Sequence, residues 1–403
     1  MKIHTAGISS RLWFFILSSS SLFFFFFAYD SPSPMYSGLE KIFGESYASY
    51  HNLLYSVYAL PNLLLPLLFN LSAGSESIKM LYTYSLIVLG QTIMCIGVAT
   101  KIFECMLAGR FIIGLGGESF SIAQNKMLAS LFASHEHGRV FGLSVAIGRL
   151  GSILAYLLLG SLIDEGPLFC TIIATVFVWI GGVFVFITYN EWKTHWEESI
   201  ESVKGEDVHH LLPYFITMTV LLACAISPFS SNNSAILQRR LQIDFKQASR
   251  ALALQEFMAL IFTVIISIAT DKYGHRLSCI CLGSILFTLG HLMIRYSTVF
   301  YYVPSILLGI SSGLQACSWP CYPLLLSASK LGIGLSLLSC FINMAYSIWP
   351  PIISKLTDPN FKISEHFTIL FAGLASAISV YIVFTNSQRG YGLNGKKHYQ
   401  IAS

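Results

Sequence analysis

Long apolar runs, separated by short polar segments, constrain this chain more than any other feature. A helix that spans a bilayer needs about 20 mostly apolar residues. Runs of that kind lie near residues 12–28, 47–69, 80–98, 102–132, 139–162, 168–189, 213–237, 249–270, 277–296, 299–326, 331–355 and 366–385. Only 11% of the residues are charged, against about 25% in a typical soluble domain. The sequence therefore predicts an all-α membrane protein with twelve transmembrane helices.

The runs fall into two sets of six with one polar stretch between them, a layout typical of transporters built from two similar halves. We expect an N-terminal six-helix bundle over 1–189, a linker over 190–212 and a C-terminal six-helix bundle over 213–385. A polar tail, 386–403, follows.

The positions of the basic residues predict the orientation in the membrane. Of the 24 Lys and Arg residues, twelve fall on the side of the termini and the linker and nine on the other side. Because cytosolic loops carry an excess of basic residues, we expect the termini and the linker in the cytosol. The net charge of +4 does not suggest nucleic-acid binding.

Two charges interrupt the fourth and fifth apolar runs. Glu118 lies in GRFIIGLGGESFSIAQN and Arg149 in VFGLSVAIGRLGS. Each is about 20 Å of helix from the connecting loop, and a lone charge at that depth costs roughly 3 kcal/mol. One acid and one base at similar depth could clamp the two ends of a zwitterion, or they could form a bridge that only holds two helices together. Asn125 follows Glu118 by seven residues and shares its helix face.

Two motifs resemble those of the major facilitator superfamily. Asp271-Lys-Tyr-Gly-His-Arg276 is similar to its D-x-x-G-x-R loop, and Arg110 with Gly114 and Gly116 is similar to its R-x-x-x-G-x-G signature. The resemblance implies a fold of two six-helix halves. It also implies a conformational latch at Asp271, Arg276 and Arg110.

A closer resemblance, over most of the chain, is to the lysosomal dipeptide transporters of that superfamily. The strings GRFIIGLGGESFSIAQN, VFGLSVAIGRLGS, YSVYALPN and LLGISSGLQACSWP carry it. It implies that Glu118 and Arg149 hold the two ends of a dipeptide, with Trp319 alongside. It further implies a lysosomal or vacuolar membrane, with the plasma membrane as the alternative, and a single-span accessory subunit.

Other polar groups in the apolar runs extend the candidate site. We expect Tyr55, within YSVYALPN, and Asn343, on the eleventh span, to contact the substrate. Glu256 on the eighth span has two interpretations: a proton site, or a partner of Arg250 six residues earlier.

The predicted function is a transporter that moves dipeptides or similar small zwitterions by alternating access, as a uniporter. A proton-coupled carrier of an organic anion or sugar is the first alternative, and a membrane receptor or scaffold without transport is the second. We expect no enzyme activity, cofactor or metal site, because no nucleotide-binding motif or zinc-ligand spacing is present in the sequence.

Overall fold

The computed structural model describes residues 8–44, 47–72, 74–132, 136–196, 209–296, 300–326, 328–356, 361–391 and 393–394. Its secondary structure is helical. The helices of the first half of the chain are α1 (Ile8–Asp30), α2 (Tyr36–Phe43), α3 (Tyr47–Ala59), α4 (Leu65–Leu71), α5 (Glu76–Thr100), α6 (Phe103–Leu131), α7 (His137–Leu162) and α8 (Pro167–His195). Those of the second half are α9 (Leu212–Leu241), α10 (Phe245–Tyr273), α11 (Arg276–Tyr296), α12 (Tyr302–Gln315), α13 (Tyr322–Leu325), α14 (Ala328–Leu356) and α15 (Lys362–Arg389).

Eleven described helical segments are long and apolar enough to span a membrane, in agreement with the predicted fold class. The expected run 299–326 is not one continuous helix. It consists of α12, the 3₁₀ turn η4 (Ala316–Cys321) and α13. Pro320 and Pro323 lie in this stretch, and a proline inside a helix removes one backbone hydrogen bond and clashes with the preceding turn. The tenth span is therefore interrupted close to its predicted substrate residue, Trp319.

Some helix ends differ from the predicted boundaries. Helix α15 continues to Arg389, into the segment predicted as a polar tail, and α8 continues to His195, into the predicted linker. The short helix α2 was not predicted. The predicted linker also includes residues 197–208, which lie outside the described part of the chain.

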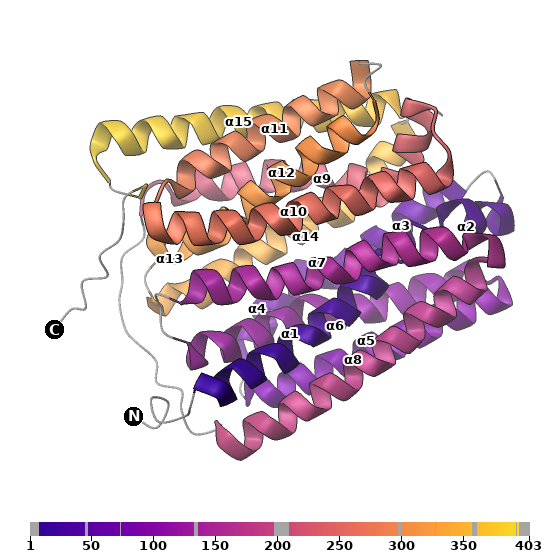
Figure 1. The fold of residues 1–403 in the computed structure, drawn as a ribbon, viewed down its shortest axis with the longest axis horizontal. Coiled ribbons are helices and arrows are strands. Elements are labelled where there is room, and N and C mark those ends of the chain that lie inside the picture. Colours follow the sequence, from indigo (N-terminus) through magenta and orange to yellow (C-terminus); the bar gives the residue numbers. More distant parts are fainter. Residues whose placement is uncertain are drawn as a thin grey trace.

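The long helices lie side by side in an elongated bundle (Figure 1). Helices α1–α8, indigo to magenta, gather on one side of it and α9–α15 on the other. Along the border α7 packs on α10, and α14 packs on α3. We call the end of the bundle where α1 begins and α15 ends the near end, and the opposite end, where α2 lies, the far end. The predicted orientation makes the near end cytosolic.

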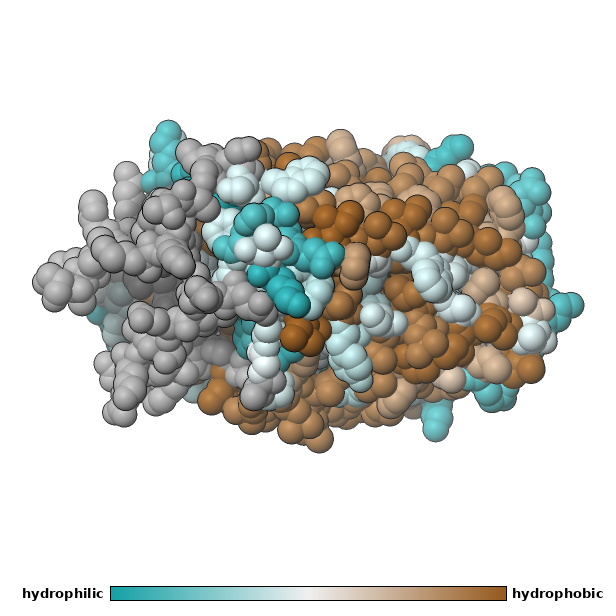
Figure 2. Space-filling view, turned by 90° about the horizontal axis from the view of Figure 1, so that it is seen from below, coloured by the Kyte–Doolittle hydropathy of each residue, from teal (hydrophilic) through white to brown (hydrophobic). Residues whose placement is uncertain are grey.

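The outside of the bundle is apolar. Figure 2 shows a broad hydrophobic belt between the two ends, with hydrophilic side chains at the far end. Large apolar side chains are exposed along this belt, including Val176, Trp179 and Val183 of α8. An apolar surface of this extent is stable in contact with lipid rather than water, so the chain is a multi-pass integral membrane protein.

Close helix contacts at glycine set the spacing inside the bundle. A Cβ atom on Gly114 of α6 would overlap the carbonyl oxygen of Tyr58 on α3, and a Cβ on Gly309 of α12 would overlap that of Gln255 on α10. Small residues allow membrane helices to approach this closely. The second contact places α12 directly beside Glu256 of α10.

Candidate substrate-binding site

Arg149 forms an ion pair with Glu256, which lies on the opposite side of the border between the two sets of helices. Its Nη1 atom lies 2.7 Å from Oε2 of Glu256 on α10, and its Nη2 atom donates to the Ser312 hydroxyl on α12 at 2.9 Å. The Nε atom is buried and has no hydrogen-bond partner. The side chains of Arg149 and Glu256 keep 19% and 21% of their surface exposed. The guanidinium is therefore paired yet still reachable by water.

Small residues of α7 explain why Arg149 faces α10. Gly148 lies against the Phe26 ring of α1, and a Cβ on Gly151 would overlap the Phe23 carbonyl. This face of α7 is thus occupied by α1. Arg149 is one residue, or about 100°, away from Gly148 and projects elsewhere.

Glu118 binds a different helix of the second set. The Ser339 hydroxyl on α14 donates to its Oε2 at 3.4 Å, and Asn343, one turn further along α14, is also a hydrogen-bonding neighbour. Asn343 additionally donates to the Ser339 carbonyl at 2.9 Å. Glu118 and Arg149, both in the described part of the chain, each take their own partner rather than each other. Asn343, predicted from sequence to contact the substrate, does lie beside Glu118.

Asp30 is a carboxylate that the sequence reading missed. It ends α1 half-buried, with the Ser152 hydroxyl of α7 as its hydrogen-bonding neighbour and with Glu256, Arg149 and Arg110 as the charges that act on it. It follows the first apolar run by two residues, where an acidic residue predicts the start of a loop. Only the packing of α1 on α7 brings it toward Arg149.

Arg110 lies in a closed aromatic cage. Its side chain has no exposed surface, and its Nε and Nη1 atoms donate to the Leu54 and Tyr29 carbonyls at 3.1 and 3.2 Å. The guanidinium lies 5.2, 5.1 and 5.2 Å from the ring centres of Tyr29, Tyr55 and Tyr58. Arg110 thus ties α6 to α1 and α3, and Tyr55 belongs to this cage.

The remaining predicted residues lie apart from these groups. Trp319 in η4 keeps 51% of its surface exposed and contacts the Tyr322 ring. Asn125 is exposed on α6. Asp271 falls near the end of α10, and its side chain lies outside the described part of the structure. Arg276 begins α11 across the short turn, so the latch between Asp271 and Arg276 stays a prediction.

Polar pairs join the two sets of helices at the far end. Arg239 of α9 pairs with Glu40 of α2 at 3.2 Å, and Lys246 of α10 pairs with Asp164 at 2.7 Å. Asn232 and Asn233 of α9 add three hydrogen bonds, to Asn52 at 2.6 Å, to Tyr156 at 3.0 Å, and from Ser33. These contacts join the two sets of helices at the far end.

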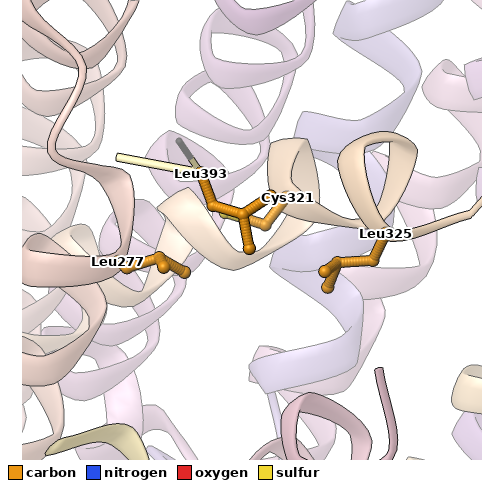
Figure 3. Close-up of a pocket in the computed structure, with 4 residues that line it drawn as sticks. All are labelled: Leu277, Cys321, Leu325 and Leu393. Carbon is orange, nitrogen blue, oxygen red and sulfur yellow. The ribbon is translucent and has the colours of Figure 1, made fainter. Parts of the chain in front are cut away.

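A hollow near the other end is unrelated to these charges. It is too narrow to hold a water molecule and is lined by Leu277, Cys321, Leu325 and Leu393 (Figure 3). Its lining holds no charged group that could bind a zwitterion. Arg149 and Glu118, on the inner faces of long helices, remain the better candidates.

Many spanning helices in two sets, with paired charges between the sets, are typical of a membrane transporter. The family can be named more closely. The sequence profile of the Major Facilitator Superfamily matches residues 18–232, more than half of the chain, and the protein belongs to this family.

Named relatives and solved structures are also similar to this chain. The chain is 22% identical to the lysosomal dipeptide transporter MFSD1 of Mus musculus, an alignment that covers 91% of this chain and 84% of that protein. It is 25% identical to the protein of the same name from Danio rerio, with 91% and 85% covered. Among solved structures, the human organic anion transporter MFSD10 is similar with a TM-score of 0.69 and 14% identity, over 93% of this chain and 99% of the other. A bacterial homologue of the iron transporter ferroportin is similar with a TM-score of 0.69 and 15% identity, over 91% of this chain and 99% of the other. At these identities the solved structures show the fold alone.

Proposed function

We propose that the protein carries dipeptides or similar small zwitterions by alternating access, as a uniporter of the lysosomal or vacuolar membrane. One observation carries the proposal: an acid and a base at mid-helix depth, Glu118 and Arg149, each bind a partner across the border between the helix sets rather than each other. The similarity to proteins named lysosomal dipeptide transporters over 91% of the chain supports the choice of substrate and membrane.

In the proposed binding mode, Glu118 accepts the substrate's amine and Arg149 binds its carboxylate. Asn343 and Ser339 from α14, together with Ser312 from α12, line the opposite side. A guanidinium favours two parallel bonds to a carboxylate, and an ammonium group needs acceptors only. Because the two charges recognise the amine and the carboxylate at the ends of the dipeptide, the dipeptide's side chains are not contacted by either charge. Such a site accepts many sequences but limits peptide length.

The two ends of the substrate would then link the two sets of helices. Both charges belong to the first set, and their present partners belong to the second. Rocking of one set against the other exposes such a site to each side of the membrane in turn. The far-end contacts of Arg239 and Lys246 hold one gate closed, and substrate release toward the far end requires their rupture. The latch at Asp271 and Arg276 would act at the near end.

The second candidate is a proton-coupled carrier of an organic anion or sugar. Two carboxylates near Arg149 favour it. Glu256 forms an ion pair with Arg149, and Asp30 interacts with Arg149 electrostatically. In that mode Arg149 would bind the anion while a carboxylate carries the proton. A receptor or scaffold would bind a ligand without flux. The single-span accessory subunit implied by the family resemblance stays a prediction.

Uptake into proteoliposomes separates these functions. The purified protein is reconstituted, and uptake of a panel of labelled dipeptides, tripeptides, single amino acids, sugars and organic anions is measured with and without a pH gradient. We expect dipeptide uptake that does not require the gradient and falls sharply for tripeptides. Accumulation of an anion or sugar that collapses with the gradient would favour the second candidate. Saturable binding without uptake would favour the receptor.

A further inference from the structure

Glu256 takes no part in the clamp described above, yet its Oε2 atom lies 2.7 Å from Nη1 of Arg149. Its sequence neighbour Arg250 is exposed, and the bond to Arg149 replaces the pairing within α10 that sequence allowed. We propose that Glu256 is an internal substitute for the substrate's carboxylate, which occupies Arg149 until a substrate displaces it. This inference rests on the proposed function, because it assigns the substrate carboxylate to Arg149.

The geometry makes such an exchange feasible. Glu256 holds Arg149 through one oxygen, Oε2, while Ser312 takes the second terminal nitrogen and Nε is left without a partner. A carboxylate that forms two parallel bonds with a guanidinium is bound more strongly than one that forms a single bond. An incoming substrate carboxylate can therefore replace Glu256 and Ser312 on the same guanidinium.

Solvent access lowers the free-energy cost of the state in which Glu256 has left Arg149. About a fifth of the Glu256 side chain is exposed (21%), so water can hydrate the carboxylate once it leaves Arg149. A fully buried carboxylate that loses its only partner would instead be strongly destabilised.

The exchange couples binding to movement. The bond between Arg149 and Glu256 joins α7 to α10, which pack along the border of the two helix sets. When a substrate takes Arg149, that link is broken at the depth of the site. When the substrate leaves, Glu256 pairs with Arg149 again. A carrier that returns without cargo then does not move an unpaired Arg149 through the bilayer centre, where such a charge is costly.

Competition by the Glu256 carboxylate also lowers the apparent affinity of the protein for a dipeptide. If Glu256 holds Arg149 about nine-tenths of the time, the apparent dissociation constant is about tenfold higher than the intrinsic one. Removal of the competing carboxylate should recover that factor for substrates with a free carboxylate. It should not change the affinity of an amidated peptide, which does not compete for Arg149.

The test compares Glu256→Gln with the wild-type protein in proteoliposomes, using L-alanyl-L-alanine and its C-terminal amide. We expect roughly tenfold tighter binding of the free dipeptide by Glu256→Gln and unchanged binding of the amide. Exchange of labelled for unlabelled dipeptide should persist, while net efflux, which needs the return of the unloaded carrier, should slow. Glu104→Gln is the matched control, since it makes the same change of carboxylate to amide at an exposed position at the start of α6, and it should bind both ligands as the wild type does. If Glu256→Gln folds poorly, Glu256→Asp, a weaker competitor with a shorter reach, should show the same changes to a smaller degree.

Unchanged or weaker binding of the free dipeptide by both Glu256 variants would overturn the proposal and make Glu256 a structural group or a substrate contact. A second readout needs no dipeptide. The rate at which phenylglyoxal modifies Arg149, followed by mass spectrometry, should rise in Glu256→Gln. If the wild-type protein binds no dipeptide but this rate still rises, the proposed function fails and the role of Glu256 as the occupant of Arg149 stands. An unchanged rate would contradict that role.

Discussion

Replacement of Arg110 should cost the fold more than it costs substrate affinity. Arg110→Met removes the guanidinium hydrogen bonds to the Leu54 and Tyr29 carbonyls, now 3.1 and 3.2 Å long. Each hydrogen bond lost from a charged donor costs about 1.5–3 kcal/mol, and the guanidinium's attraction to each of the three tyrosine rings is worth about 0.5–2 kcal/mol more. Because the charge itself is expensive to bury, we expect the lower part of that range, about 4 kcal/mol. That is about a thousandfold in the folding equilibrium.

The assay is thermal unfolding of the purified protein in detergent, followed by tryptophan fluorescence, together with dipeptide affinity of the folded fraction. Arg110→Lys keeps the charge but not the planar fork, so it should recover only part of the loss. Tyr55→Phe is the matched control, because it keeps the ring that faces Arg110 and removes only a hydroxyl. If Arg110→Met unfolds at the wild-type temperature and only turnover falls, Arg110 is a conformational latch, as the family motif implies, and not a structural tie.

Three further predictions concern helix packing and the two gates. Gly114→Ala should lower the unfolding temperature, since its Cβ would overlap the Tyr58 carbonyl, while Gly373→Ala, which meets no atom within 4 Å, should not. Arg239→Glu places a like charge beside Glu40 and should favour the state that is open at the far end. A cysteine introduced there should then be labelled faster, and the added change Glu40→Arg should restore the wild-type labelling rate. Asp271→Asn should lower the transport rate more than the substrate affinity, because a loop remote from the site biases only the conformational equilibrium. The reverse pattern in flux and binding assays would contradict the latch.

The sequence predicts the fold well, because apolar run length alone separates membrane helices from loops. It does not predict the interruption of the tenth span, where Pro320 and Pro323 interrupt a run that remains apolar throughout. Nor does it predict α2 (Tyr36–Phe43), since a single short helix carries no run of spanning length.

The candidate site is only partly readable from sequence. Glu118 and Arg149 stand out because charge is rare within spans. The partners are hidden: whether Glu256 meets Arg250 on its own helix or Arg149 on another depends on how α7 packs against α10. Asp30 is hidden for the same reason, since only tertiary packing brings the end of α1 to Ser152 and the charges around it.

The central claim is that Glu118 and Arg149 hold opposite ends of one substrate. The most direct measurement is the affinity of L-alanyl-L-alanine, its N-acetyl form and its C-terminal amide for three proteins. These are the wild type, Glu118→Gln, and the double variant Arg149→Gln/Glu256→Gln. The second change in the double variant ensures that the Glu256 carboxylate does not remain without its partner Arg149. Loss of one partner of a desolvated charge pair costs about 3–5 kcal/mol. We expect Glu118→Gln to lose affinity for peptides with a free amine and not for the N-acetyl form. The double variant should lose affinity for peptides with a free carboxylate and not for the amide. Equal losses for capped and uncapped peptides in either protein would contradict the clamp.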